Sequence, residues 1–158
     1  MLSSPHSPYP RINDHYPKLS RSNSAGLLFF ESRYEEAIEF YRLALGAEVT
    51  MLVRFKDSPD PGMHAPGSEN KVLHASFRIE NTILMASDGR CKDKPSFKGF
   101  SLSHTVPNEA EAKRLFAALA DNREIQLPLS KTFFSPCFGM ETDRFSVFWL
   151  IIVAADSQ

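Results

Sequence analysis

Cysteine, glycine and long apolar runs are all scarce in this sequence. Its 158 residues include only two cysteines and seven glycines. Cys91 and Cys137 form no CxxC pair and no disulfide framework, so a reducing, cytoplasmic setting is the simplest interpretation. No stretch reaches the ~20 consecutive apolar residues of a membrane span. The longest apolar run, residues 147–155, instead has the length of a buried strand.

An excess of charge of either sign is also missing. The 18 basic and 19 acidic residues give a formal net charge of -1. A nucleic-acid-binding protein or a protein of anionic membranes usually carries a clear basic patch or basic excess. We therefore expect no nucleic-acid partner and no membrane partner.

Apolar residues are few before residue 25. Segment 1–24 carries prolines at positions 5, 8, 10 and 17 and lacks the apolar core of a secretory signal. Such a segment buries too little apolar surface to offset the entropy of ordering. We therefore expect a flexible tail over residues 1–24, followed by one folded domain over residues 25–154.

That domain contains the same pattern of elements twice. The first copy predicts a strand, then a helix from the capping box of Ser32 and Glu35 to Gly46. Three strands follow, over residues 48–55, 72–79 and 82–87. The second copy predicts a strand over residues 100–106, a helix capped by Asn108 with Glu111 three positions on, and strands over residues 124–129, 138–141 and 145–153.

The repeat predicts an α+β fold built of two βαβββ modules, over about residues 25–88 and 99–154. Each helix has one apolar face, which has to be buried on one side of a sheet. We expect curved, mainly antiparallel sheets around a cup, with the helices on the outer faces, and a small ligand in the cup. A general α+β domain with two helices is the alternative.

Alternation along the strands selects the side chains that face the cup. In residues 72–79, the polar side chains His74, Ser76 and Arg78 share the face opposite the apolar ones. In residues 100–106, Ser101 and Ser103 share a face in the same way. His104 falls on the helix side, where we expect a packed histidine. For His74, a structural role is the alternative to ligand binding.

Other residues near the cup have structural interpretations beside the functional ones. Phe134 lies near the loop that would close the cup, where it either joins the core or stacks on a planar ligand. Asp88 begins a turn with Gly89. Cys137 has no adjacent base in sequence, which favours an inert buried thiol over a nucleophile.

Five stretches of the sequence resemble one known family. They are LLFFESRYEEAIEFYRLALGAEV, MLVRFKDSP, KVLHASFRIENTILMASDG, GFSLSHTVPNEAEAKRLFAAL and KTFFSPCFGMETDRFSVFWLI. Together they are similar to the PhnB-like branch of the vicinal-oxygen-chelate superfamily, which includes glyoxalases, bleomycin-resistance proteins and extradiol dioxygenases. Some proteins of this branch are named as ubiquinone-pathway methyltransferases. This sequence has no GxGxG motif between a strand and a helix, which a nucleoside cofactor would need.

The resemblance implies a fold in which some members bind a metal through four strands. The corresponding positions here fall near Gly26 and Met85 and at Ser101 and Trp149. None of these residue types is a good ligand for a divalent first-row metal, which prefers imidazole, carboxylate or thiolate. We therefore expect no metal and no cofactor.

The resemblance also implies a homodimer, and the last strand adds a physical reason. Residues 145–153 have almost no polar residue on either face, and a strand that is apolar on both faces has to be covered on both. One face can meet the helix. We expect the other face, with Val147, Trp149 and Ile151, to line the cup or a subunit contact.

Three functions are consistent with these observations. The first is a module of the bleomycin-resistance type that binds a small molecule without a metal. The second is an enzyme, either a metal-free lyase or isomerase or one with a metal shifted to His74. The third is a dimeric interaction protein without a ligand. We assign no catalytic residue, and the candidate ligand-binding residues are His74, Ser76, Arg78, Met85, Ser101, Ser103, Phe134 and Trp149.

Overall fold

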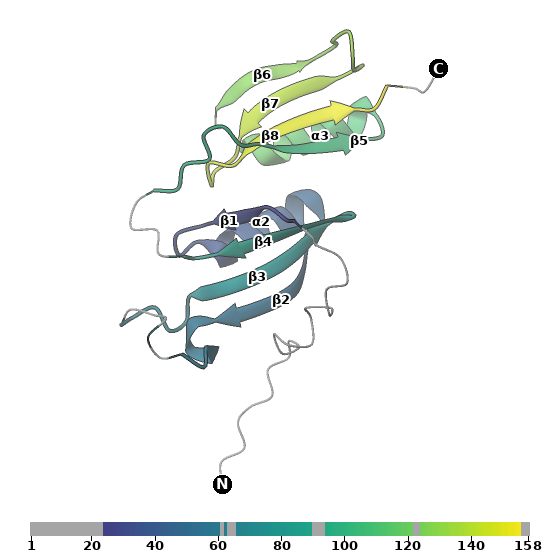
Figure 1. Cartoon of the computed structure of the whole chain (residues 1–158). Coiled ribbons are helices and arrows are strands. Elements are labelled where there is room, and N and C mark those ends of the chain that lie inside the picture. The colour runs from purple at the N-terminus through teal and green to yellow at the C-terminus, as the bar shows by residue number, and fades with distance from the viewer. Residues whose placement is uncertain (1–23, 61, 63–65, 90–93, 122–123, 156–158) are drawn as a thin grey trace. The chain divides into compact units, whose positions relative to one another are not determined.

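The computed structural model describes residues 24–60, 62, 66–89, 94–121 and 124–155 (Figure 1). Nearly all of the predicted tail, residues 1–23, lies outside these residues. The chain divides into two compact units, residues 1–93 and 94–158. We refer to their folded parts as the first module and the second module.

The first module is one four-stranded sheet with one helix. Its elements are β1 (Leu27–Phe29), α2 (Tyr34–Leu45), β2 (Glu48–Arg54), the short 3₁₀ helix η1 (Phe55–Asp57), β3 (Val72–Ile79) and β4 (Thr82–Ser87). The strand order is β1-β4-β3-β2. Strand β1 is parallel to β4, and the other two pairs are antiparallel.

The second module repeats this arrangement. Its elements are β5 (Leu102–Val106), α3 (Glu109–Ala120), β6 (Ile125–Ser130), β7 (Phe138–Thr142) and β8 (Phe148–Val153), in the strand order β5-β8-β7-β6. Again the first strand is parallel to the last, and the other pairs are antiparallel. The α+β fold of two βαβββ modules with mainly antiparallel sheets is thus confirmed. The cup, which requires both modules, stays a prediction.

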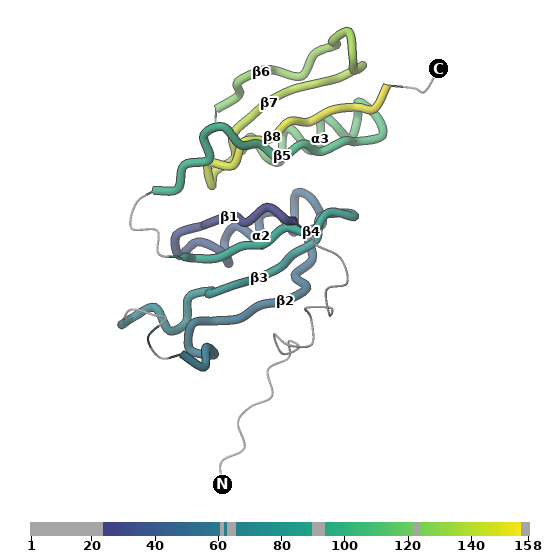
Figure 2. The backbone as a smooth tube through the Cα atoms, in the orientation of Figure 1, coloured from purple at the N-terminus to yellow at the C-terminus, as the bar shows by residue number. Residues whose placement is uncertain are grey.

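Each helix covers one face of its own sheet, as Figures 1 and 2 show. In the first module the ring of Tyr41 on α2 stacks on Phe77 of β3, with ring centroids 6.3 Å apart and an interplanar angle of 9°. In the second module α3 packs so closely on β7 that a Cβ added at Gly139 would lie 2.7 Å from Cε2 of Phe116. We call the opposite face of each sheet, which no described helix of its own module covers, its open face.

The two helix starts agree with the sequence analysis in one case only. Asn108 caps α3 as predicted, because its Oδ1 accepts a hydrogen bond from the amide of Glu111 at 2.9 Å. The predicted capping box of Ser32 is wrong. Helix α2 begins at Tyr34, and Arg33 at the N-cap makes no side-chain capping bond.

Asp88 does the capping of α2 from the end of β4. Its Oδ1 accepts from the amide of Tyr34 at 3.0 Å, and its Oδ2 accepts from the amide of Val72 at 2.9 Å. A buried carboxylate is a stronger acceptor at a helix N-terminus than a neutral hydroxyl. Asp88 therefore joins β4, α2 and β3, beyond its predicted role in a turn.

Candidate functional site

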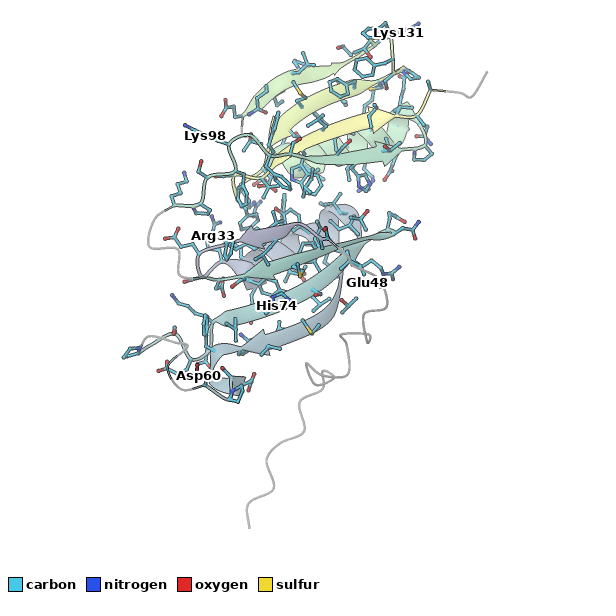
Figure 3. The ribbon with its side chains drawn as sticks, viewed as in Figure 1. Arg33, Glu48, Asp60, His74, Lys98 and Lys131 are labelled. Atoms are coloured by element: carbon cyan, nitrogen blue, oxygen red, sulfur yellow. The ribbon has the colours of Figure 1, made fainter. Side chains whose placement is uncertain are left out.

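The strand pairing brings four of the predicted site residues onto the open face of the first module. Ser76 of β3 is opposite Met85 of β4, and Arg78 is opposite Ile83. Alternation along β3 places His74 on the same face, and Figure 3 shows His74 and Glu48 on this sheet. His74 is half-buried, and burial lowers the pKa of its imidazole.

Arg78 is held by its own module. Its Nη2 forms an ion pair with Oε2 of Glu48 at 2.5 Å, and its Nη1 donates to the carbonyl of Glu80 at 3.2 Å. Both partners of the ion pair are exposed, so it contributes little to stability. The guanidinium remains charged, and an acidic ligand would have to compete with Glu48 for it.

An apolar strip lies along β1 and β4 of the first module. Leu27 of β1 is opposite Met85, and Leu27, Phe29 and Ile83 are large apolar side chains with substantial exposure, 51% for Ile83. Exposed apolar residues gathered on one strand pair indicate a surface that contacts something else. Met85 is the one residue of this strand pair among the predicted ligand-binding residues.

Trp149 does not lie where the sequence analysis expected it. In the pairing of the second sheet it is opposite both Leu102 and Glu141, on the face that α3 covers. It is only 2% exposed, and its Nε1 donates to Oδ2 of Asp143 at 2.9 Å. The prediction that Val147, Trp149 and Ile151 line the cup or a subunit contact is therefore wrong.

The open face of the second module carries the alternate residues of β8. Thr142 of β7 is opposite Phe148, and Met140 is opposite Leu150. Ser103 of β5 is opposite Leu150 as well, so it lies on the predicted face. Because both faces of β8 are apolar, alternation alone could not determine which set meets the helix.

A cleft of about 560 Å³ lies in the second module, at the end of the sheet where β7 finishes and β8 begins. Ser101 is the one predicted site residue in it. The strands and the β7–β8 turn contribute Gln126, Thr142, Ser146 and Phe148. The segment before β5 contributes residues 95–100, including Phe97, Lys98 and Phe100, and Glu124 lies just before β6. Most of these residues were not predicted, because the path of segment 95–100 has no periodic signal in the sequence.

Phe134 lies at a different part of the second module. Its ring contacts Phe133 and Phe138 edge-on, each at a centroid distance of 5.1 Å. It is 44% exposed and is not part of the cleft lining. Phe134 and the cleft are thus separate candidates for ligand contact.

Two buried carboxylates lie behind the cleft, on the α3 side of the sheet. Glu141 is 0% exposed, and neither of its carboxylate oxygens has a hydrogen-bond partner within the described residues. Burial, with a smaller contribution from the negative charge of Asp143, raises the pKa of Glu141 to about 8. Asp143 itself accepts from the amides of Phe145 and Val147 and from Trp149.

The residues present do not fit a divalent first-row metal. Within the described residues, no three His, Cys, Asp or Glu side chains gather closely enough to hold a metal ion. At the positions implied by the superfamily, the carbonyl of Gly26 accepts from the amide of Met85 at 2.8 Å, and Ser101 lines the cleft. Trp149 lies on the face that α3 covers. The next residue along β8, Leu150, lies on the open face and has no side-chain atom that could bind a metal.

Cys137 is a buried thiol, in agreement with the sequence analysis. It is 5% exposed, and burial raises its pKa. A thiol with a raised pKa is a weak nucleophile at neutral pH.

In the part of the chain that the structure describes, no helix is long and apolar enough to cross a membrane.

Comparison with known proteins assigns the fold and then the family. A solved structure named as a glyoxylase/bleomycin resistance protein/dioxygenase domain, from Frankia sp. EAN1pec, shares the fold at 16% identity with a TM-score of 0.53. The model of the family described as 3-demethylubiquinone-9 3-methyltransferase matches residues 22–152. The chain therefore belongs to this family, the PhnB-like branch of the vicinal-oxygen-chelate superfamily.

Three relatives illustrate the match. Protein YjdN of Escherichia coli (strain K12) is 33% identical over 134 residues, which cover 80% of this chain and 91% of YjdN. The crystal structure of PA1353 from Pseudomonas aeruginosa is 36% identical, covers 86% of this chain and 100% of its own, and has a TM-score of 0.74. A Bacillus cereus PhnB protein, named a putative 3-demethylubiquinone-9 3-methyltransferase, is 29% identical, covers 84% and 100%, and has a TM-score of 0.71.

Proposed function

We propose that this protein binds a small organic molecule in the cleft of the second module, without a metal ion. The observation that carries the proposal is the cleft itself, about 560 Å³ in volume and lined by three phenylalanines and several uncharged polar side chains. Volumes of this size and linings of this kind are typical of small-molecule sites. His74, Ser76 and Met85, on the open face of the first module, remain further candidates for ligand contact.

Binding fits the lining of the cleft better than catalysis does. The described residues that line the cleft include no histidine and no cysteine, and the charged ones among them are Lys98 and Glu124, both exposed. A general acid or base is usually a partly buried group whose pKa is shifted by its surroundings. We therefore propose a function of the bleomycin-resistance type. The alternative is an enzyme, either a metal-free lyase or isomerase or one with a metal shifted to His74.

The cleft is tested with a neutral fluorescent dye, N-phenyl-1-naphthylamine. We expect micromolar binding to the wild type and about ten-fold weaker binding to Phe148→Ala, because the variant removes one apolar wall. The matched control is Ile152→Ala, on the open face of the same strand but outside the cleft. Equal loss of affinity in both variants, or none in either, would place the dye elsewhere and refute the cleft as the binding site.

We also propose a cytoplasmic homodimer that carries no metal. The exposed apolar strip of Leu27, Phe29 and Ile83 supports a contact with a second copy, since monomers rarely leave such a patch in water. The location is supported by the small number of cysteines, two in the sequence, which form no CxxC pair and no disulfide framework. In native mass spectrometry we expect the mass of two chains with no added metal. A monomer at micromolar concentration would contradict the dimer, and one bound metal ion for each chain would contradict the metal-free site.

A further inference from the structure

Two polar side chains in the cleft are fixed with respect to each other. Gln126 of β6 and Thr142 of β7 both line the cleft, and Nε2 of Gln126 donates to Oγ1 of Thr142 at 2.6 Å. Because the threonine oxygen accepts this bond, its own proton points elsewhere and can be donated. The amide oxygen of Gln126 remains an acceptor. The pair thus presents a donor and an acceptor side by side.

Aromatic rings stand beside this polar pair. Phe148 is directly opposite Thr142 in the pairing of β7 and β8, so its ring lies next to the hydroxyl on the open face. Phe97 and Phe100 line the same cleft from the segment before β5. Phenylalanine rings favour a planar aromatic ligand, which they can contact face-to-face when offset or edge-to-face.

The charges of the lining argue for an uncharged ligand. Among the described residues, Lys98 and Glu124 are the charged ones that line the cleft, one of each sign, and both side chains are exposed to water. An ionic ligand would lose hydration on entering without gaining a buried counter-charge. The hydroxyls of Ser101 and Ser146 and the Gln126–Thr142 pair are neutral partners instead.

We infer that the cleft selects an uncharged, planar aromatic molecule whose edge carries a hydrogen-bond acceptor next to a donor, as in a cyclic aromatic amide. Its carbonyl oxygen accepts from the hydroxyl of Thr142, and its N–H donates to Oε1 of Gln126. Phe148 contacts the ring. This inference depends on the proposed function, since it describes the ligand of the same cleft.

The test compares 1-isoquinolone, which carries the N–H and C=O edge, with N-methyl-1-isoquinolone and with naphthalene. In calorimetric or NMR titrations we expect 1-isoquinolone to bind at least about ten-fold more tightly than either comparison molecule. Each hydrogen bond to the polar pair is worth a net ~0.5–1.5 kcal/mol, and the two bonds together correspond to this range of affinity. The chemical shifts of Gln126 and Thr142 should change during the titration.

Variants assign that preference to the polar pair. Thr142→Val and Gln126→Met should each reduce the preference for 1-isoquinolone to about two-fold or less. Thr142→Ser, which retains the hydroxyl, should keep the preference of the wild type. The matched control is Thr105→Val, a threonine on the open face of β5 that does not line the cleft. It should keep the full preference. Unchanged thermal unfolding confirms that a variant is folded.

Two outcomes overturn the inference, and each has a different meaning for the proposed function. If the three molecules bind equally and still displace the neutral dye, the ligand class is wrong and the cleft remains the binding site. If none binds at millimolar concentration and the dye is insensitive to Phe148→Ala, both proposals fail.

Discussion

Asp143→Ala is expected to lower the free energy of unfolding of the second module by about 3–5 kcal/mol. The carboxylate accepts from the amide of Phe145 at 2.8 Å, from the amide of Val147 at 3.0 Å and from Nε1 of Trp149 at 2.9 Å. Alanine leaves these three buried donors without their charged acceptor. Each loss costs ~1–3 kcal/mol, reduced in part because the neighbouring Glu141 is relieved of a negative charge.

The measurement is urea unfolding followed by tryptophan fluorescence. Trp149 is the only tryptophan in the sequence, so the signal reports on the second module. The matched control is Asp121→Asn, which breaks the ion pair with Arg144 at the end of α3. This pair is partly exposed, and we expect a loss of no more than ~1 kcal/mol. Equal losses in the two variants would show that the bonds of Asp143 do not hold the turn.

Asp143→Asn should give an intermediate loss. The amide oxygen can keep the two backbone bonds, but the amide nitrogen then faces Nε1 of Trp149, and two donors repel. Ser146 in this turn has φ 69°, a backbone conformation that is unfavourable for residues other than glycine. The turn therefore depends on the hydrogen bonds to the side chain of Asp143, which offset this cost. The side chain of Asp143 thus fixes both the turn and the orientation of β8.

Elements with a local signal could be predicted from the sequence. The hairpin of β3 and β4 has the predicted bounds, because both strands alternate regularly and the Glu80–Asn81 turn separates them. The stop of α2 at Gly46, with φ 66°, and the cap of α3 at Asn108 were predicted for the same reason. In each case the deciding partners are at most a few residues apart.

Features that depend on distant partners could not be predicted. Asp88 caps α2 from 54 residues away, which no local window contains, so Ser32 was the best local choice. The orientation of β8 depends on the bond from Trp149 to Asp143, because the strand is apolar on both faces. The cleft depends on the path of residues 95–100, and Ser101 is the one lining residue that was predicted, from the alternation of its strand.

Glu141 gives the second module a stability that falls as pH rises. Its pKa is about 8 in the folded protein and close to its ordinary value of 4.5 in the unfolded chain. Between these values the folded state holds one proton more than the unfolded state. The contribution of Glu141 is therefore fully present below pH 4.5 and is lost as pH rises to about 8, at up to ~1.4 kcal/mol for each pH unit.

Glu141→Gln is expected to remove this dependence. Glutamine stays neutral at every pH. From pH 5 to pH 8 the free energy of unfolding of the variant should therefore rise by about 3–4 kcal/mol relative to that of the wild type. The unpaired amide can lower the stability of the variant at pH 5, but it does not change this pH dependence. The physical reason is the absence of compensation around the carboxylate. The buried residues of α3 are all apolar, and the charge of the adjoining turn that acts on Glu141 is the negative one of Asp143.

Urea unfolding at a series of pH values, followed through Trp149, measures the difference between the two proteins and cancels the contributions of all other titrating groups. Glu109→Gln, on the exposed side of α3, controls for the simple loss of a carboxylate. It should leave the pH profile of the wild type unchanged. Parallel profiles for the wild type and Glu141→Gln would mean that Glu141 is ionised in the folded protein. The second sheet would then have to open to water on its α3 side, because no described residue bonds the carboxylate there.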